Sequence, residues 1–121
     1  FKQAMHIADS PNNGLDFCMG CWSEMGEDVI AALNHFLSKD QIFYVHFRDV
    51  QGSVPVFNEC FLGEGNVNIA SAMRTLHTGG FSGFLIDDHV PHMIDDTPWG
   101  HRGRAFATGQ MMGLLAAIQD S

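Results

Sequence analysis

Basic residues are scarce in this chain: six Lys and Arg stand against fourteen Asp and Glu among 121 residues. Phosphate binding needs clustered Lys and Arg, so this balance argues against nucleic acid as a partner. No apolar run approaches the roughly 20 residues that a membrane span requires. Three cysteines are an odd number and too few to staple a domain, which favours a reducing, cytoplasmic setting.

The remaining pattern is an alternation of strands and helices. Predicted strands cover about residues 15–19, 42–47 and 83–87, and predicted helices cover about 26–38, 68–78 and 102–119. Such alternation indicates a parallel sheet with crossover helices. A complete eight-stranded α/β barrel needs about 250 residues. We therefore expect residues 1–121 to form a single α/β domain that is part of a (β/α)8 TIM barrel, with about three βα units.

Each predicted strand ends in a residue type that binds metals: Cys18, His46 and Asp88. Since the carboxyl ends of parallel strands meet at one edge of a sheet, we expect these side chains to converge. An imidazole beside a carboxylate suits Mn²⁺ or Fe²⁺ better than Ca²⁺. Strand alternation predicts that Asp87 and Asp88 point in different directions, so that only one of them meets His46.

Cys18 and Cys21 form a C-x-x-C motif, which allows several interpretations. Thioredoxin-type redox chemistry, structural zinc, an inert buried thiol and a ligand role for Cys18 all remain open. The glycines at 20 and 26 and an apolar helical period that begins only at Val29 predict no helix at Cys18, which disfavours the redox interpretation. We expect Cys21 to lie outside the ligand group and not to be disulfide-bonded to Cys18.

Arginines supply the candidate anion contacts. Arg48 is suited to a bidentate clamp on a substrate carboxylate, or else to an ion pair with Asp49 or Glu59. Arg102 and Arg104 stand at the predicted start of the last helix, where positive charge opposes the helix dipole, so an anion contact is a candidate role for them.

Five short motifs, in this order and spacing, resemble the mannonate dehydratase family of the xylose-isomerase-like barrel superfamily. They are residues 13–18 (NGLDFC), 45–50 (VHFRDV), 57–59 (FNE), 80–83 (GFSG) and 88–91 (DHVP). The similarity runs over nearly the whole chain and implies that it corresponds to the carboxyl-terminal third of that barrel. Two departures stand out: Asp87 replaces the family's usual proline, and the loop near Trp99 lacks its tyrosine.

The resemblance implies a divalent metal, usually manganese, held by a cysteine, two histidines and an aspartate. Cys18, His46 and Asp88 would be three of these ligands, and the second histidine would precede Phe1. His89 matches a residue implicated in proton transfer. The implied reaction is loss of water from D-mannonate, which gives 2-keto-3-deoxy-D-gluconate in hexuronate breakdown.

By the same resemblance, Arg48, Glu59 and Arg102 are the expected contacts to the sugar-acid substrate. Two other classes stay open: a sugar isomerase or epimerase of the same superfamily, and a catalytically silent fragment. Three βα units leave sheet edges and an apolar layer uncovered, so we expect a homo-oligomer.

Overall fold

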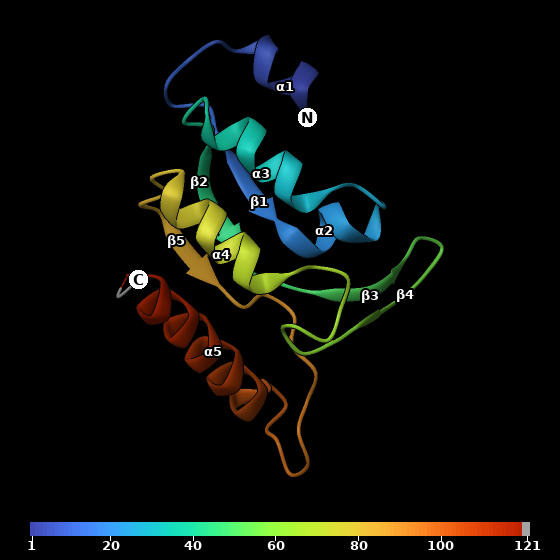
Figure 1. Ribbon diagram of the computed structural model, residues 1–121. Helices are drawn as coiled ribbons and strands as arrows, with labels where there is room; N and C mark the ends of the chain where they lie inside the picture. Colours follow the sequence, from blue (N-terminus) through green and yellow to red (C-terminus); the bar gives the residue numbers. More distant parts are fainter. Residues whose placement is uncertain (120–121) are drawn as a thin grey trace.

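The computed structural model describes residues 1–119, and its main sheet has three parallel strands (Figure 1). In spatial order they are β1 (Leu15–Cys18), β2 (Ile42–His46) and β5 (Phe84–Ile86). Both strand pairs are parallel, as the alternation of strands and helices predicted. All three strands lie within or at the predicted ranges, and each is one or two residues shorter.

Five helices accompany these strands in the described part of the chain. They are α1 (Lys2–Ile7), α2 (Met19–Glu24), α3 (Val29–Leu37), α4 (Ile69–Thr78) and α5 (His101–Gln119). The last three correspond to the predicted helices. Asp28 and Asn68 begin α3 and α4 by accepting a backbone N–H with their side chains, which satisfies one of the donors that a helix start leaves free.

Helix α2 corrects the prediction that no helix begins at Cys18. The Cys18 sulfur caps the helix by accepting from the backbone N–H of Cys21 at 3.4 Å. Gly20 lies inside the helix. A Cβ at this position would lie only 2.7 Å from Cδ of Arg48. This glycine therefore marks the close approach of a buried arginine, which the local sequence does not reveal.

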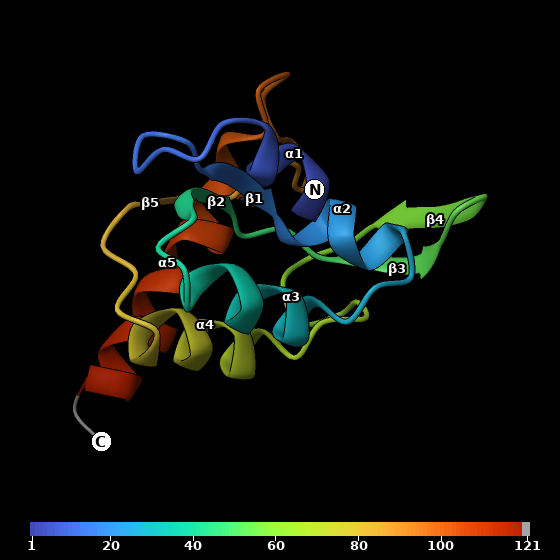
Figure 2. The same cartoon turned by 90° about the horizontal axis from the view of Figure 1, so that it is seen from above.

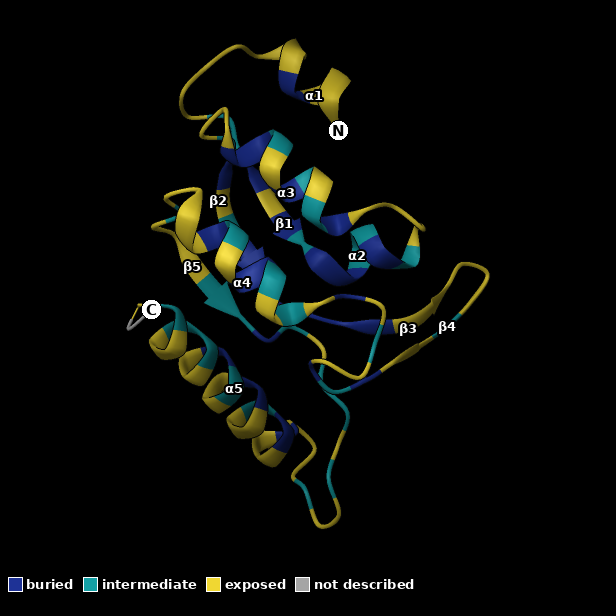
Figure 3. Ribbon diagram, in the orientation of Figure 1, coloured by how far each residue is buried: buried dark blue, intermediate teal, exposed yellow. Residues whose placement is uncertain are grey.

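Helices α3 and α4 cover one face of the sheet, and α5 packs beside α4 (Figures 1 and 2). The core lies between these layers, where the dark-blue buried residues gather in Figure 3. Val45 in β2 and Phe47 directly after it belong to this core and are fully buried. By strand alternation Phe43 shares their face, but it remains 44% exposed, because it lies near the start of the strand against Gly14.

The opposite face of the sheet carries the polar side chains. Tyr44 and His46 alternate with the buried residues of β2, and their rings meet edge to face at 5.4 Å. On β5, Phe84 is 78% exposed on this side of the chain. This face has no helix layer among the described residues, and it leads to the candidate site.

A hairpin follows β2 and forms a second, antiparallel sheet. Its strands are β3 (Val50–Ser53) and β4 (Val56–Glu59). Asp49 anchors the hairpin and the loop after it. Its buried carboxylate accepts four backbone N–H groups, those of Val50, Gly63, Gly65 and Val67.

Helix α5 contacts the rest of the chain through Gly103, Ala107 and Met111, one residue per turn. Gly103 is needed there, since a Cβ would lie 2.4 Å from the Pro91 carbonyl. Phe106 is 45% exposed, and its ring contacts that of Phe61 edge to face. No helix within residues 1–119 is long and apolar enough to cross a bilayer.

Candidate metal centre

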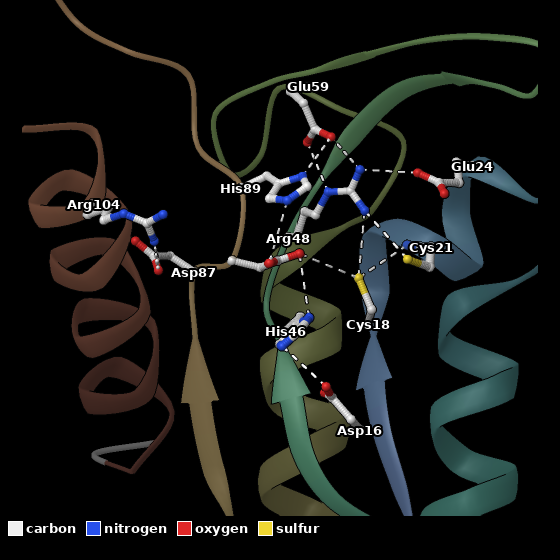
Figure 4. A network of polar contacts seen from close by, with 11 residues as sticks. Asp16, Cys18, Cys21, Glu24, His46, Arg48, Glu59, Asp87, His89 and Arg104 are labelled. Atoms are coloured by element: carbon white, nitrogen blue, oxygen red, sulfur yellow. Dashed lines mark hydrogen bonds and ion pairs between the residues drawn. The ribbon is translucent and has the colours of Figure 1, made fainter. Parts of the chain in front are cut away.

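Cys18, His46 and Asp88 converge at the carboxyl ends of the three parallel strands. Figure 4 shows Cys18 and His46 at the ends of their strands. Cys18 pairs in register with His46, and His46 pairs with Ile86, two residues before Asp88. The Asp88 carboxylate lies 3.4 Å from Nδ1 of His46 and 3.9 Å from Sγ of Cys18. All three side chains are half-buried. The predicted convergence of these residues is therefore present in the fold.

The backbone turns sharply at Asp88, which separates it from its neighbour. Asp88 has a φ of 52°, in the left-handed region, where Asp is one of the few residues that is tolerated. Asp87 points away from the cluster and pairs with Arg104 on α5 at 2.8 Å. Only Asp88 meets His46, as strand alternation predicted.

The three side chains fit a divalent metal ion in both distance and chemistry. Metal–ligand bonds are about 2.0–2.3 Å long, so two ligands on one ion lie within about 4.6 Å of each other. The separations of 3.4 and 3.9 Å satisfy that limit. A thiolate, an imidazole and a carboxylate are ligands of transition metals and leave positions open for a substrate.

Asp16 supports His46 from the side away from Asp88. Its carboxylate lies 3.3 Å from Nε2 of His46, while Nδ1 faces Asp88. A carboxylate on one ring nitrogen fixes the tautomer and orientation that the other nitrogen offers to a metal. The geometry thus identifies Nδ1 as the nitrogen of His46 that faces the ligand group.

Arg48 connects the cluster to its surroundings. It is 4% exposed, and its guanidinium donates to both carboxylate oxygens of Glu59 and, at 3.1 Å, to Glu24. Its Nη1 approaches the sulfurs of Cys18 and Cys21 at 3.7 and 3.6 Å. The hydrogen bonds that Arg48 donates to Glu59 raise the pKa of Arg48 above its ordinary value, although burial acts in the opposite direction.

Glu59 lies between Arg48 and His89. Its Oε1 is 3.3 Å from Nδ1 of His89, an imidazole that is 62% exposed. Burial by itself raises the pKa of Glu59, but the hydrogen bonds to Arg48 and His89 outweigh it and lower the pKa from its ordinary value. Nε2 of His89 lies 3.8 Å from Asp88, so His89 borders the cluster.

Arg102 lies in a different environment. Its side chain donates to the carbonyl of Ile94 at 2.7 Å, and its backbone N–H donates to Asp96. No contact between its guanidinium and the cluster occurs among the described residues. A substrate contact by Arg102 stays a prediction, as does one by Arg48 and Glu59, which bind each other here.

Several residues of the site were not identified from the sequence. Asp16 carried a signal, because residues two apart on a strand share a face, and Cys18 is two residues further on. Glu24 carried none, since its partner Arg48 lies 24 positions away in the chain. Arg104 was a candidate anion contact, and the anion that it meets is Asp87, 17 positions away. Only the folded chain brings these charges together.

Comparison with known proteins matches this chain to one family. The family described as "D-mannonate dehydratase (UxuA)" matches residues 1–121. Mannonate dehydratase 2 of Halalkalibacterium halodurans is 32% identical over 107 residues, which cover 85% of this chain and 30% of that protein. Mannonate dehydratase of Streptococcus equi subsp. zooepidemicus is 30% identical over 123 residues, covering 96% of this chain and 34% of that protein.

A solved structure is similar over the same length. The crystal structure of mannonate dehydratase from Streptococcus suis serotype 2 superposes with a TM-score of 0.89 and 24% sequence identity. The match covers 98% of this chain and 36% of that one. At this level of identity the likeness shows the fold. The chain spans about a third of the length of the relatives that it matches.

Proposed function

The chain belongs to the D-mannonate dehydratase (UxuA) family, and we propose that it supplies the metal-binding part of an enzyme that dehydrates D-mannonate to 2-keto-3-deoxy-D-gluconate in hexuronate catabolism. The observation that carries this proposal is the convergence of Cys18, His46 and Asp88 within 4.8 Å. We place the chain at the carboxyl-terminal portion of a (β/α)8 barrel, where ligands at strand ends form the active site.

In this proposal Cys18, His46 and Asp88 hold Mn²⁺, with Fe²⁺ as the alternative. When bound, the ion stabilises the negative charge that develops as the proton α to the substrate carboxylate leaves. Asp16 holds the His46 ring so that Nδ1 points at the ligand group. A single cluster of three such residues occurs in the described chain, which favours a dehydratase over an isomerase with carboxylates that bridge two metals.

His89 is the proposed proton-transfer residue. Glu59 contacts its Nδ1 at 3.3 Å, so the Nδ1–H tautomer leaves the lone pair of Nε2 free to accept a proton. The exposed imidazole borders Asp88, where a substrate bound at the cluster would present its reacting carbon. The same nitrogen, once protonated, would assist departure of the β-hydroxyl group.

Arg48, Glu59 and Arg102 are proposed to orient the acid substrate. Arg48 and Glu59 do so indirectly, because their charged groups are paired with each other and hold His89 and the Cys18 sulfur in place. Arg102 borders the loop after β5, and of the two arginines it is the one whose guanidinium contacts only a backbone carbonyl among the described residues. It is therefore the cation best able to meet a substrate carboxylate.

Assembly and location belong to the same proposal. Two outer strands of the parallel sheet, β1 and β5, each have one neighbour among the described residues, and such edges pair readily with another chain. We therefore propose a homo-oligomer. The three cysteines are free, which is consistent with a cytoplasmic location.

A chimera tests the proposed reaction. Residues 1–121 replace the matched third of mannonate dehydratase 2 of Halalkalibacterium halodurans, and formation of the 2-keto acid from D-mannonate is measured with Mn²⁺. We expect turnover that Asp88→Asn abolishes and Asp87→Asn retains in part. A folded chimera that binds Mn²⁺ but releases no keto acid would contradict the proposal.

The chain alone should have no activity or barely detectable activity. Its described residues supply three ligand atoms, and metal affinity depends on a complete ligand set with its supporting shell. Robust turnover by the chain alone that Asp88→Asn abolishes would show instead that these residues are sufficient.

A further inference from the structure

The thiols of Cys18 and Cys21 are both within hydrogen-bond distance of the same donor. Nη1 of Arg48 is 3.7 Å from the first sulfur and 3.6 Å from the second. The backbone N–H of Cys21 also donates to Sγ of Cys18 at 3.4 Å. Figure 4 shows both side chains beside the same guanidinium, at the start of α2. Two sulfurs that share a donor are neighbours in space.

Their three-residue spacing at a helix start is that of the C-x-x-C motif of disulfide oxidoreductases. Residues three apart at a helical turn lie next to each other, and a disulfide spans about 4.4–6.8 Å between Cα atoms. Gly20 lies between the two cysteines and is packed against Arg48. Sequence patterns disfavoured redox chemistry at this motif because they predicted no helix at Cys18. Helix α2, which Cys18 caps, removes that objection.

We infer that Cys18 and Cys21 form a reversible disulfide by exchange with a small-molecule disulfide such as oxidised glutathione. One cysteine thiolate attacks a glutathione sulfur, which forms a mixed disulfide and releases one glutathione thiolate. The second cysteine thiolate then attacks the protein sulfur of that mixed disulfide and releases the other. The protein dithiol loses two electrons, and the two released thiolates take up the two protons as reduced glutathione.

Either thiol can form the mixed disulfide, because both sulfurs lie beside Nη1 of Arg48. The other thiol then reacts within the molecule, where the neighbouring sulfur is at high effective concentration. Cys60 is buried, burial raises its pKa to about 11, and it serves as an internal reference.

The disulfide would control the metal site, a consequence that rests on the proposed function. Sγ of Cys18 belongs to the ligand group with His46 and Asp88, whereas Cys21 does not. A metal requires the thiolate form of its cysteine ligand. Oxidation therefore removes one ligand, and a bound metal protects Cys18 from oxidation.

The test oxidises the whole chain with excess oxidised glutathione in the absence of metal and measures free thiols, intact mass and a peptide map. We expect free thiols to fall from three to one, with a Cys18–Cys21 crosslink and no glutathione adduct. Cys60→Ser should form the same crosslink and end with no free thiol. Cys21→Ser should end with glutathione on Cys18. Wild-type protein that keeps three thiols, carries stable glutathione or crosslinks Cys60 would overturn the inference.

A second arm repeats the oxidation with saturating Mn²⁺. We expect the crosslink to form at least about tenfold more slowly, because the ion occupies the Cys18 thiolate. If the crosslink forms without metal and Mn²⁺ does not slow it, the inferred disulfide is confirmed and the proposed metal role of Cys18 is wrong. If no crosslink forms and Mn²⁺ still binds, the inferred disulfide is wrong and the proposed metal site is confirmed.

Discussion

Cys18 and His46 are register partners on neighbouring parallel strands, so a thiol and an imidazole leave the sheet at the same level. The next strand carries the register on to Ile86, and Asp88 follows two residues later with a left-handed backbone that turns its carboxylate towards His46. The three ligand atoms therefore owe their proximity to strand pairing and to the turn at Asp88.

Asp16 should set the metal affinity through His46. Asp16→Asn replaces the charged acceptor at 3.3 Å from Nε2, and loss of such a supporting carboxylate typically lowers metal affinity by about 10–100-fold. Titration calorimetry with Mn²⁺ measures this change. Asp9→Asn, on an exposed residue outside the cluster, is the matched control and should bind like wild type. Equal affinities for Asp16→Asn and Asp9→Asn would refute the role given to Asp16.

Asp49 should be essential for stability rather than for metal binding. Its two oxygens accept four backbone N–H groups in a buried position, and Asp49→Asn turns one acceptor into a donor that faces them. We expect a loss of about 3 kcal/mol in the free energy of unfolding, since hydrogen bonds to a buried charge are strong. Urea denaturation measures it, with the exposed Asp40→Asn as control. A loss no greater than that of the control would contradict this role.

Glu59 should make the fold sensitive to acid. Its pKa is lowered from the ordinary 4.5 by its hydrogen bonds to Arg48 and His89, which outweigh burial. The folded protein binds this proton more weakly than the unfolded chain, so the stabilisation is fully present above pH 4.5 and is lost as the pH falls below that value. The free energy of unfolding should therefore decrease on acidification, and less steeply in Glu59→Gln.

The comparison uses urea denaturation at several pH values, with Glu27→Gln on an exposed residue as control. Glu59→Gln leaves Arg48 without its main partner, so its stability near neutral pH should also be lower than that of wild type. The informative quantity is the slope of the free energy of unfolding against pH. Parallel slopes for wild type and Glu59→Gln would exclude Glu59 as the acid-sensitive group.

The isolated chain should self-associate. Phe84 and Met112 are large apolar side chains that are mostly exposed, and β1 and β5 each have one strand neighbour in the described sheet. Exposed edges and apolar patches favour pairing, and we expect the interface to exceed the roughly 1,200–2,000 Å² of a standard contact. Light scattering at micromolar concentration measures the mass. A stable monomer there would be incompatible with this prediction.

Much of the fold could be predicted because it depends on local patterns. The apolar alternation of β2 and the helical period of α3 mark the elements, and Asn68 and Gly79 mark where α4 begins and ends. The divergence of Asp87 and Asp88 followed from alternation alone. Strand order then determined which side chains converge.

The parts that could not be predicted depend on contacts between distant residues. Helix α2 follows the Cys18 cap, and its Gly20 lies against Arg48, which is 30 positions beyond Cys18 in the chain. The loop at residues 60–67 is held by Asp49, whose acceptors are satisfied by backbone groups that carry no sequence signature. Residue patterns report local preference, and these features arise from tertiary packing.

Cobalt(II) spectroscopy of the purified chain tests the central claim most directly, because a thiolate ligand gives Co²⁺ a sulfur charge-transfer band in the near ultraviolet. The account predicts a band that saturates at one Co²⁺ per chain, that Mn²⁺ competes away, and that is lost in Cys18→Ser and weakened in Asp88→Asn. Cys21→Ser and Asp87→Asn should retain it, since neither side chain belongs to the ligand group. A band that survives Cys18→Ser, or that disappears in Cys21→Ser instead, would contradict the proposed metal centre.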